Sequence, residues 1–379
     1  MPTFHYANPE TIHWGAGCLR EKLDSELRRI GGGRVFIVTT RSAVREPALA
    51  PAIESMLGDR FAGRFADIGQ HAPARSVMDA VRAVRESRAD ALLSVGGGSP
   101  IDAAKTVAFS IATGLDVTLP DAPARARGAK LDGVLPHLAV PTTLSVAELA
   151  GSAGFSAEGT KEKVGVAAPQ LRPAAVFYDA TLAVKTPLDL WLSTGIRAVD
   201  HAVETYCNQR AHPATEALSL QGLRLLARAL PAIKRAPGDL APRLEAQFGM
   251  WQAIAPAASG IPTGASHGIG YALGATFGVA HGHTSCVMLH AVLKWNAAVN
   301  AERQKALSEA RGQPGRPASD LVRELVVGLD QPVTLRSVGI KRENIDELAR
   351  RALSYQPVQL NPRPIKTAGD VKEILELAW

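Results

Sequence analysis

Three consecutive glycines followed by Ser-Pro-Ile-Asp form the segment of this chain that most directly predicts chemistry. The apolar run 91–95 reads as a buried strand, and glycines 96–98 then allow a sharp turn with backbone N–H groups open to an anion. Ser99 fits the N-cap of a following helix, with Pro100 at N1 and Asp102 at N3. A strand, a glycine turn and a capped helix start predict a phosphate-binding turn, because free N–H groups and the helix dipole converge there. The alternative is a tight turn without a ligand.

Arg197 and three histidines in the second half of the chain could do acid–base chemistry. Arg197 and His201 are four residues apart in a helical pattern, so they share one helix face. His267 and His281 lie further along, next to glycine and alanine residues. Small neighbours leave room for a ligand, and imidazoles titrate where proton transfer is useful. Any one histidine alone fits a structural role better, but the group of three favours a catalytic site.

The elements that must position these residues change in character along the chain. Short β-branched runs at 35–40, 91–95, 137–140 and 175–178 alternate with helical patterns such as 76–87. This alternation predicts an α/β fold, an open and largely parallel sheet with helices on both faces. No GxGxxG follows the first strand, which disfavours an ordinary Rossmann domain.

The second half of the chain is rich in alanine, leucine, arginine and glutamate at helical spacing, with few runs typical of strands. We therefore expect an α/β dinucleotide-binding domain over 1–183 and an all-helical catalytic domain over 184–379. Residues 120–129 and 312–317 are expected to be loops.

Composition narrows the class of protein. The 379 residues suffice for two domains, and the net charge of +6 comes without a polybasic block, which argues against nucleic-acid binding. The chain contains no run of about 18 apolar residues and begins without a secretory pattern, so we expect no membrane partner. Cys18, Cys207 and Cys286 are isolated, which favours a reducing, cytoplasmic location and argues against a zinc cluster.

Taken together and in this order, the motifs resemble the iron-containing alcohol dehydrogenase superfamily. They are 96–105 (GGGSPIDAAK), Pro-Thr-Thr at 141–143, His-Ala-Val-Glu at 201–204, His267 and His281. The resemblance implies an N-terminal NAD(P)-binding domain, a helical C-terminal domain and an active site between them; a homodimer is also expected. The cofactor-binding residues it implies, together with the end of the second strand, are Thr40, Gly96, Gly97, Gly98, Ser99, Asp102, Thr142 and Thr143.

One departure from the family concerns its metal ion. Metal-dependent members bind iron or zinc with an aspartate and three histidines, and here the aspartate position is Arg197. A guanidinium cannot ligate a cation and repels one. Asp200 is expected to project from a different face of the helix and so not to replace the aspartate. Tyr271 stands where many members have a further histidine. We therefore expect the metal to be absent; His201, His267 and His281 would bind one if any is present.

The resemblance extends to maleylacetate reductases, a branch that works without a metal. The spacing from Pro141 to Glu148 and the tail Asn361-Pro362-Arg363-Pro364 are similar, although those enzymes usually have asparagine where this chain has Arg197. The implied function is NAD(P)H-dependent reduction of a small anionic substrate such as maleylacetate, in aromatic-compound catabolism. The alternatives are a metal-dependent alcohol dehydrogenase or aldehyde reductase, and a non-redox or inactive nucleotide-binding relative.

Without a metal, the positive field for reduction must come from side chains. Arg197, protonated histidines or both could supply it, and an arginine can hold a carboxylate by two hydrogen bonds. The alternative for Arg197 is a surface ion pair with Asp200 or Glu204. The predicted strand 35–40 ends at Thr40 and is followed by Arg41 and not by an acid, so NADPH is expected to be accepted alongside NADH.

Overall fold

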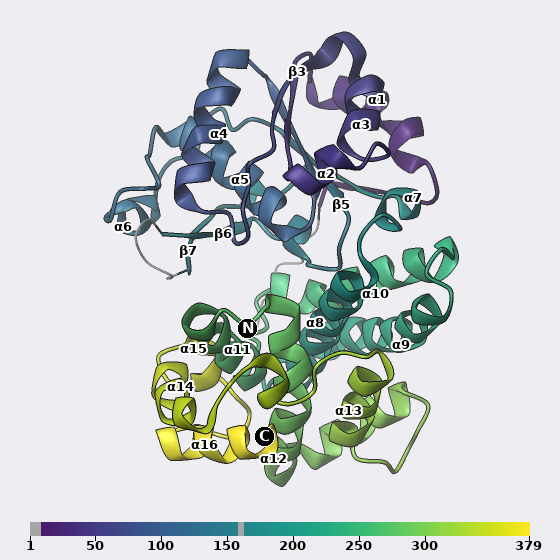
Figure 1. Cartoon of the computed structure of the whole chain (residues 1–379), viewed down its shortest axis with the longest axis vertical. Helices are drawn as coiled ribbons and strands as arrows, with labels where there is room; N and C mark the ends of the chain where they lie inside the picture. Colours follow the sequence, from purple (N-terminus) through teal and green to yellow (C-terminus); the bar gives the residue numbers. More distant parts are fainter. Residues whose placement is uncertain (1–8, 158–162) are drawn as a thin grey trace. The chain divides into compact units, whose positions relative to one another are not determined.

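The computed structural model describes residues 9–157 and 163–379, and the chain divides into two compact units between Thr186 and Pro187. The sequence analysis places the division between residues 183 and 184. Each unit has its own hydrophobic core. The first unit holds the parallel sheet, and the second is built of helices (Figure 1).

The first unit is built on a six-stranded parallel sheet with the strand order β1-β8-β5-β4-β2-β3. The strands are β1 (Thr11–Trp14), β2 (Val35–Val38), β3 (Phe61–Phe65), β4 (Ala91–Gly96), β5 (His137–Pro141) and β8 (Ala175–Tyr178). The four strands predicted from apolar runs are the four central ones, which are buried along their whole length. Strands covered by helices on both faces carry apolar residues at nearly every position, which makes them visible in the sequence.

Helices cover both faces of this sheet. Residues of α1 (Cys18–Ile30) and α3 (Ala50–Leu57) share one core cluster with Val35 and Ile37, whereas α4 (Ala74–Ser87) and α5 (Gly98–Thr113) share another with Phe36 and Val38. Alternate residues of β2 therefore point to opposite faces, as the pleat requires. The order of strands reverses between β2 and β4, so the turns after these two strands flank the switch point where α/β sheets bind ligands.

Smaller elements complete the first unit. They are α2 (Arg41–Arg45), α6 (Ala122–Ala126), α7 (Ala180–Ala183) and an antiparallel hairpin of β6 (Ser152–Ser156) and β7 (Lys163–Ala167). The segment 120–129, expected to be a loop, thus contains one short helix, while 312–317 is irregular as expected.

The second unit is helical, and no strand occurs among its residues 187–379. Its helices are α8 (Leu188–Cys207), α9 (Pro213–Arg235), α10 (Leu240–Ala258), α11 (Ala265–Phe277), α12 (His281–Ala310), α13 (Ala318–Gly328), α14 (Ile345–Ala352), α15 (Gln356–Gln359) and α16 (Ala368–Leu377). A core cluster joins α11 and α12 to α14 and α16, and α8 packs on α9, α10 and α12. Within the described part of the chain, no helix has the length and apolar character needed to cross a membrane.

Candidate functional site

The glycine turn after β4 lies against the loop after β5 with no space to spare. Gly96 has φ +137°, and a Cβ added there would lie 2.8 Å from Pro100 Cγ. A Cβ at Gly97 would lie 3.2 Å from the Thr143 side chain, and one at Gly98 would lie 3.2 Å from Ser145 Oγ. The turn therefore requires glycine for its conformation at the first position and for close backbone approach at the next two.

The helix after this turn begins earlier than the sequence indicated. Gly97 is the N-cap of α5, so Ser99 and Asp102 do not take the capping positions predicted for them. Ser99 Oγ instead accepts a hydrogen bond of 3.1 Å from the backbone N–H of His71, and Asp102 Oδ2 accepts one of 3.3 Å from Gly154. Ser99 and Asp102 thus bond to a turn and to a strand of the same unit. Gly97 has no side chain that could cap the helix, so the N–H groups of its first turn are open to a ligand.

The other predicted cofactor-binding residues lie at the ends of the adjacent strands. Thr142 and Thr143 follow β5, are each 5 % exposed, and join the glycine turn through the Thr142 N–H, which donates to Gly96 O at 2.8 Å. Thr40 follows β2, on the other side of β4, and caps α2 by accepting from Ala43 N–H at 3.4 Å. Three neighbouring strand ends thus bring together the residues expected to bind a dinucleotide, and the tight glycine turn fits a pyrophosphate.

Replacing Gly97 with leucine is expected to weaken NADPH binding by about 100-fold, because the side chain would enter the gap to Thr143 and cover the open N–H groups. Fluorescence titration of bound NADPH measures the effect. Gly238→Leu is the control, since a Cβ there meets nothing within 4 Å. Equal NADPH affinity in the two variants would remove the glycine turn from the cofactor site.

In the helical unit, His201 of α8 and His267 of α11 lie side by side. Their Nε2 atoms are 3.3 Å apart and their ring centroids 4.2 Å apart. On its other side, His267 Nδ1 lies 2.8 Å from Glu204 Oε2 and 3.4 Å from Asp200 Oδ2. We refer to Arg197, Asp200, His201, Glu204 and His267 as the α8–α11 cluster. It contains two predicted catalytic histidines and two carboxylates for which the sequence predicted no catalytic role.

Arg197 is buried at the centre of this cluster. Its Nη1 donates to Ser285 Oγ at 2.9 Å and lies 3.8 Å from Asp200 Oδ2, and its Cζ lies 5.6 Å from the Tyr271 ring centroid. The alternative of a surface ion pair is therefore wrong, because Arg197 is only 3 % exposed.

The expectation that Asp200 projects from a different helix face is also wrong. At about 100° per residue, three residues return to within about 60° of the starting direction, so positions three apart are neighbours. Asp200 Oδ2 accepts hydrogen bonds from Ser266 Oγ at 2.8 Å and Ser285 Oγ at 2.5 Å, which tie α8 to α11 and α12. Asp200 is therefore the buried counter-ion of Arg197.

The charges of the cluster set the protonation of its two histidines in opposite directions. Burial and Arg197 act to lower the pKa of His267, but Asp200 and Glu204 outweigh them and hold it above its ordinary value. The pKa of His201 lies well below its ordinary value. Burial is the largest cause, and the nearby charges of His267, Arg197 and His281 lower it further. The surroundings therefore favour the protonated form of His267 and the neutral form of His201.

His281 and Tyr271 lie next to this cluster through ring contacts. Tyr271 packs edge-on to His267 and parallel to His281, with centroid distances of 6.4 Å in both cases. Tyr355, near the start of α15, packs against Tyr271 at 5.7 Å and extends the aromatic wall. Tyr355 is not predictable from the sequence, because nothing in its local pattern links it to residues about 80 positions earlier.

The donor set of the cluster does not fit a divalent cation. A metal site needs at least three side chains with ligand atoms close together. Among the described residues, one such group has its ligand atoms within 4.8 Å of one another, and it consists of Asp200, Glu204 and His267. Their facing atoms already hydrogen-bond to each other, to hydroxyls and to backbone N–H groups. Arg197 adds a fixed positive charge 3.8 Å from Asp200, where a cation would need an anionic ligand.

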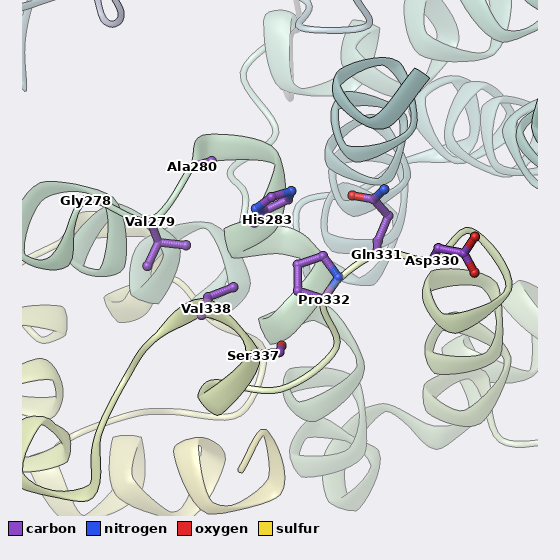
Figure 2. Close-up of a pocket in the computed structure, with 9 residues that line it drawn as sticks. All are labelled: Gly278, Val279, Ala280, His283, Asp330, Gln331, Pro332, Ser337 and Val338. Atoms are coloured by element: carbon purple, nitrogen blue, oxygen red, sulfur yellow. The ribbon is translucent and has the colours of Figure 1, made fainter. Parts of the chain in front are cut away.

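A pocket of about 490 Å³ lies beside the first turn of α12 (Figure 2). Its lining includes the loop 278–280, His283 and Gln331, but none of the predicted site residues. Gln331 Nε2 donates to Asp189 Oδ1 at 2.8 Å, and His283 Nε2 lies 3.8 Å from Asp189 Oδ2. The pocket is thus a feature separate from the α8–α11 cluster.

Comparisons with known proteins agree along nearly the whole chain. The family model described as iron-containing alcohol dehydrogenase matches residues 9–180, and the one described as Fe-containing alcohol dehydrogenase family, C-terminal, matches residues 191–379. Maleylacetate reductase of Sphingobium indicum is 30% identical over 366 residues, covering 96% of this chain and 94% of that protein. Maleylacetate reductase 1 of Cupriavidus pinatubonensis is 28% identical, with the same coverage of 96% and 94%.

Among solved structures, the crystal structure of maleylacetate reductase from Rhizobium sp. strain MTP-10005 is similar with a TM-score of 0.83. It is 25% identical and matches 100% of this chain and 99% of that chain. The parallel sheet and the helical unit of this chain are therefore both found in the maleylacetate reductase from Rhizobium sp. strain MTP-10005.

Proposed function

Because the chain belongs to the iron-containing alcohol dehydrogenase family and is an NAD(P)-dependent oxidoreductase, we propose that it reduces a carboxylate-bearing substrate without a metal ion. Maleylacetate, reduced to 3-oxoadipate, is the first candidate, since relatives similar over more than nine-tenths of this chain are named maleylacetate reductases. The observation that carries the proposal is the buried guanidinium of Arg197, which lies 3.8 Å from Asp200 Oδ2, the carboxylate oxygen that also faces His267, at the position where metal-dependent members have an aspartate.

The chemistry of the reduction explains why a fixed cation is useful. Bound NAD(P)H supplies a hydride. When a hydride adds to a carbon–carbon double bond conjugated with a carbonyl group, negative charge develops on the carbonyl oxygen. Arg197 and the His267 imidazolium are two positive charges held by Ser285, Asp200 and Glu204, and preorganised charge of this kind stabilises such an anion. Because Asp200 and Glu204 balance these two charges, we propose that a carboxylate-bearing substrate is held by hydrogen bonds from the fixed donors and not by a net positive charge.

The cofactor preference needs one correction. The sequence analysis found no acid at the end of the second strand, but Asp67, after β3, reaches this place and forms an ion pair with Arg41. The pairing raises the pKa of Arg41 and lowers that of Asp67. Both side chains are largely exposed, so the pair is weak and a 2′-phosphate can compete for Arg41. We propose that NADH and NADPH are both accepted.

The proposal predicts that activity survives metal removal. Protein treated with a chelator and shown by elemental analysis to hold well below one metal per chain is expected to reduce maleylacetate at an unchanged rate, followed by NAD(P)H absorbance. Simple aldehydes are expected to be reduced far more slowly. About one iron or zinc per chain, lost together with activity on chelation, would instead assign the protein to the metal-dependent alcohol dehydrogenases.

A further inference from the structure

The carboxylate of Glu204 is held rigidly by the start of α11. It accepts hydrogen bonds from the backbone N–H groups of Gly264 at 2.8 Å, Ser266 at 2.7 Å and His267 at 3.3 Å. The N–H of Ala265, which this carboxylate does not reach, donates to Asn361 Oδ1 at 3.3 Å. The first N–H groups of α11, which lack partners within the helix, are therefore satisfied by two side chains from distant parts of the chain.

Glu204 differs from Asn361 in one further contact. Its Oε2 lies 2.8 Å from His267 Nδ1, whereas Asn361 bonds instead to Asn296 and to the backbone. Because a carboxylate only accepts hydrogen bonds, Nδ1 of His267 must carry a proton. The ring is thereby fixed so that Nε2 faces His201, where the two Nε2 atoms meet at 3.3 Å.

One proton lies between these two Nε2 atoms, since one imidazole must donate and the other accept. The ionisable groups facing His267 are Arg197, Asp200, His201 and Glu204, all from α8, together with Tyr271 one turn along α11. Glu204 Oε2 and Asp200 Oδ2 lie 2.8 Å and 3.4 Å from His267 Nδ1, so the two carboxylates favour positive charge on the His267 ring. Burial, followed by His267, Arg197 and His281, lowers the pKa of His201 and favours its neutral form.

We propose that Glu204 is a positioning residue that, through His267 Nδ1, aims the proton held between His267 and His201 at the substrate. This inference rests on the proposed function. In the reaction, the hydride from NAD(P)H forms one C–H bond of the product and leaves NAD(P)⁺. The N–H bond of the histidine pair breaks, and its proton forms the second C–H bond. His267 is left as a neutral imidazole that still donates from Nδ1 to Glu204.

Glu204→Gln and Asn361→Ala separate this role from helix capping. Glu204→Gln removes the negative charge next to Nδ1 but keeps an amide oxygen that can accept from the helix start, whereas Asn361→Ala removes a cap of the same helical turn and leaves the Glu204 carboxylate in place. We expect Glu204→Gln to lower kcat by about 100-fold with little change in KM. Loss of the carboxylate lowers the pKa of His267. As the pH is raised, the activity of this variant should therefore begin to decrease at a lower pH than that of the wild type. Asn361→Ala should lower the melting temperature and leave the pH profile in place.

Imidazole ¹⁵N NMR of histidine-labelled protein gives a readout that needs no substrate. In the wild type, His267 Nδ1 should be protonated across neutral pH, and this signal should change in Glu204→Gln but not in Asn361→Ala. Glu204→Asp keeps the charge at shorter reach; if Glu204→Gln does not fold, this variant should retain the protonated Nδ1 and lose part of kcat.

Two results would overturn the positioning role: equal kcat losses in Glu204→Gln and Asn361→Ala with an unmoved pH profile, or a His267 Nδ1 signal that ignores Glu204. A wild-type protein inactive on maleylacetate would count against the proposed function alone, because the NMR result stands independently of substrate.

Discussion

Arg197→Asp is expected to abolish the metal-free reduction and to create a site for a divalent cation. The variant loses the buried positive charge that stabilises the developing anion, and removing one such group costs about 100- to 1000-fold in rate. It also restores, by sequence position, the aspartate and three histidines of the metal-dependent members. His201 and His267 already lie together in the structure, and His281 would have to approach them to complete the set. Carboxylate and imidazole together are ligands that Zn²⁺ and Fe²⁺ accept.

Calorimetric titration with Zn²⁺ measures the gain, and NAD(P)H absorbance measures the loss. Arg197→Ala is the matched control, because it removes the cation without adding a ligand: it should lose activity and bind no metal. Arg197→Lys keeps the charge but not the planar hydrogen-bonding geometry, so its loss should be intermediate. If Arg197→Ala reduces the substrate as fast as the wild type, the field comes from another group and the central claim about this site is wrong.

The sequence predicted those parts of the fold that are buried from both sides. The four central strands appear as nearly continuous apolar runs, with Ser94 and His137 as the polar exceptions. The edge strands β1 and β3 contain Thr-Ile-His-Trp and Phe-Ala-Gly-Arg-Phe and are half-exposed. Nothing in such short mixed segments distinguishes a strand from a loop. The edge strands are therefore not predictable from the sequence, because they are strands only through their hydrogen bonds to neighbouring strands that lie far away in the sequence.

The sequence predicted which residue types form the site but not which side chains contact one another there. His201 and His267 meet as expected, but the carboxylates that set their charges were assigned no role, because 63 positions separate Glu204 from His267. Asp200 could have been found from the sequence, since residues three apart on a helix are neighbours. The contacts of Asn361 with Asn296 and with the start of α11 depend on tertiary packing that no local pattern reports.

Lys105→Met is expected to destabilise the α/β unit by about 3–5 kcal/mol, the usual cost of breaking a buried charged network. In the sequence this lysine simply ends the glycine motif. In the structure it is fully buried, and its Nζ donates to the carbonyl oxygens of Ala147 at 2.6 Å, Ala150 at 3.2 Å and Ser152 at 2.5 Å. It also lies 3.2 Å from Asp102 Oδ1, so it joins α5 to the loop that follows Thr142 and Thr143.

Methionine fills the same space but leaves the partly buried carbonyl groups of Ala147, Ala150 and Ser152 without this donor. The loop also holds Glu148, whose pKa burial raises to about 7 and whose Oε1 accepts from Tyr178 at 3.2 Å. Because Lys105 acts to lower that pKa, its loss should leave Glu148 protonated to higher pH.

Thermal unfolding measures the stability, and NADPH titration reports whether the threonines move. Lys130→Met, an exposed lysine of the same unit, should change stability by less than about 0.5 kcal/mol. If both variants unfold at the wild-type temperature, Lys105 does not hold this loop, and the position of Thr142 and Thr143 must be fixed by the sheet alone.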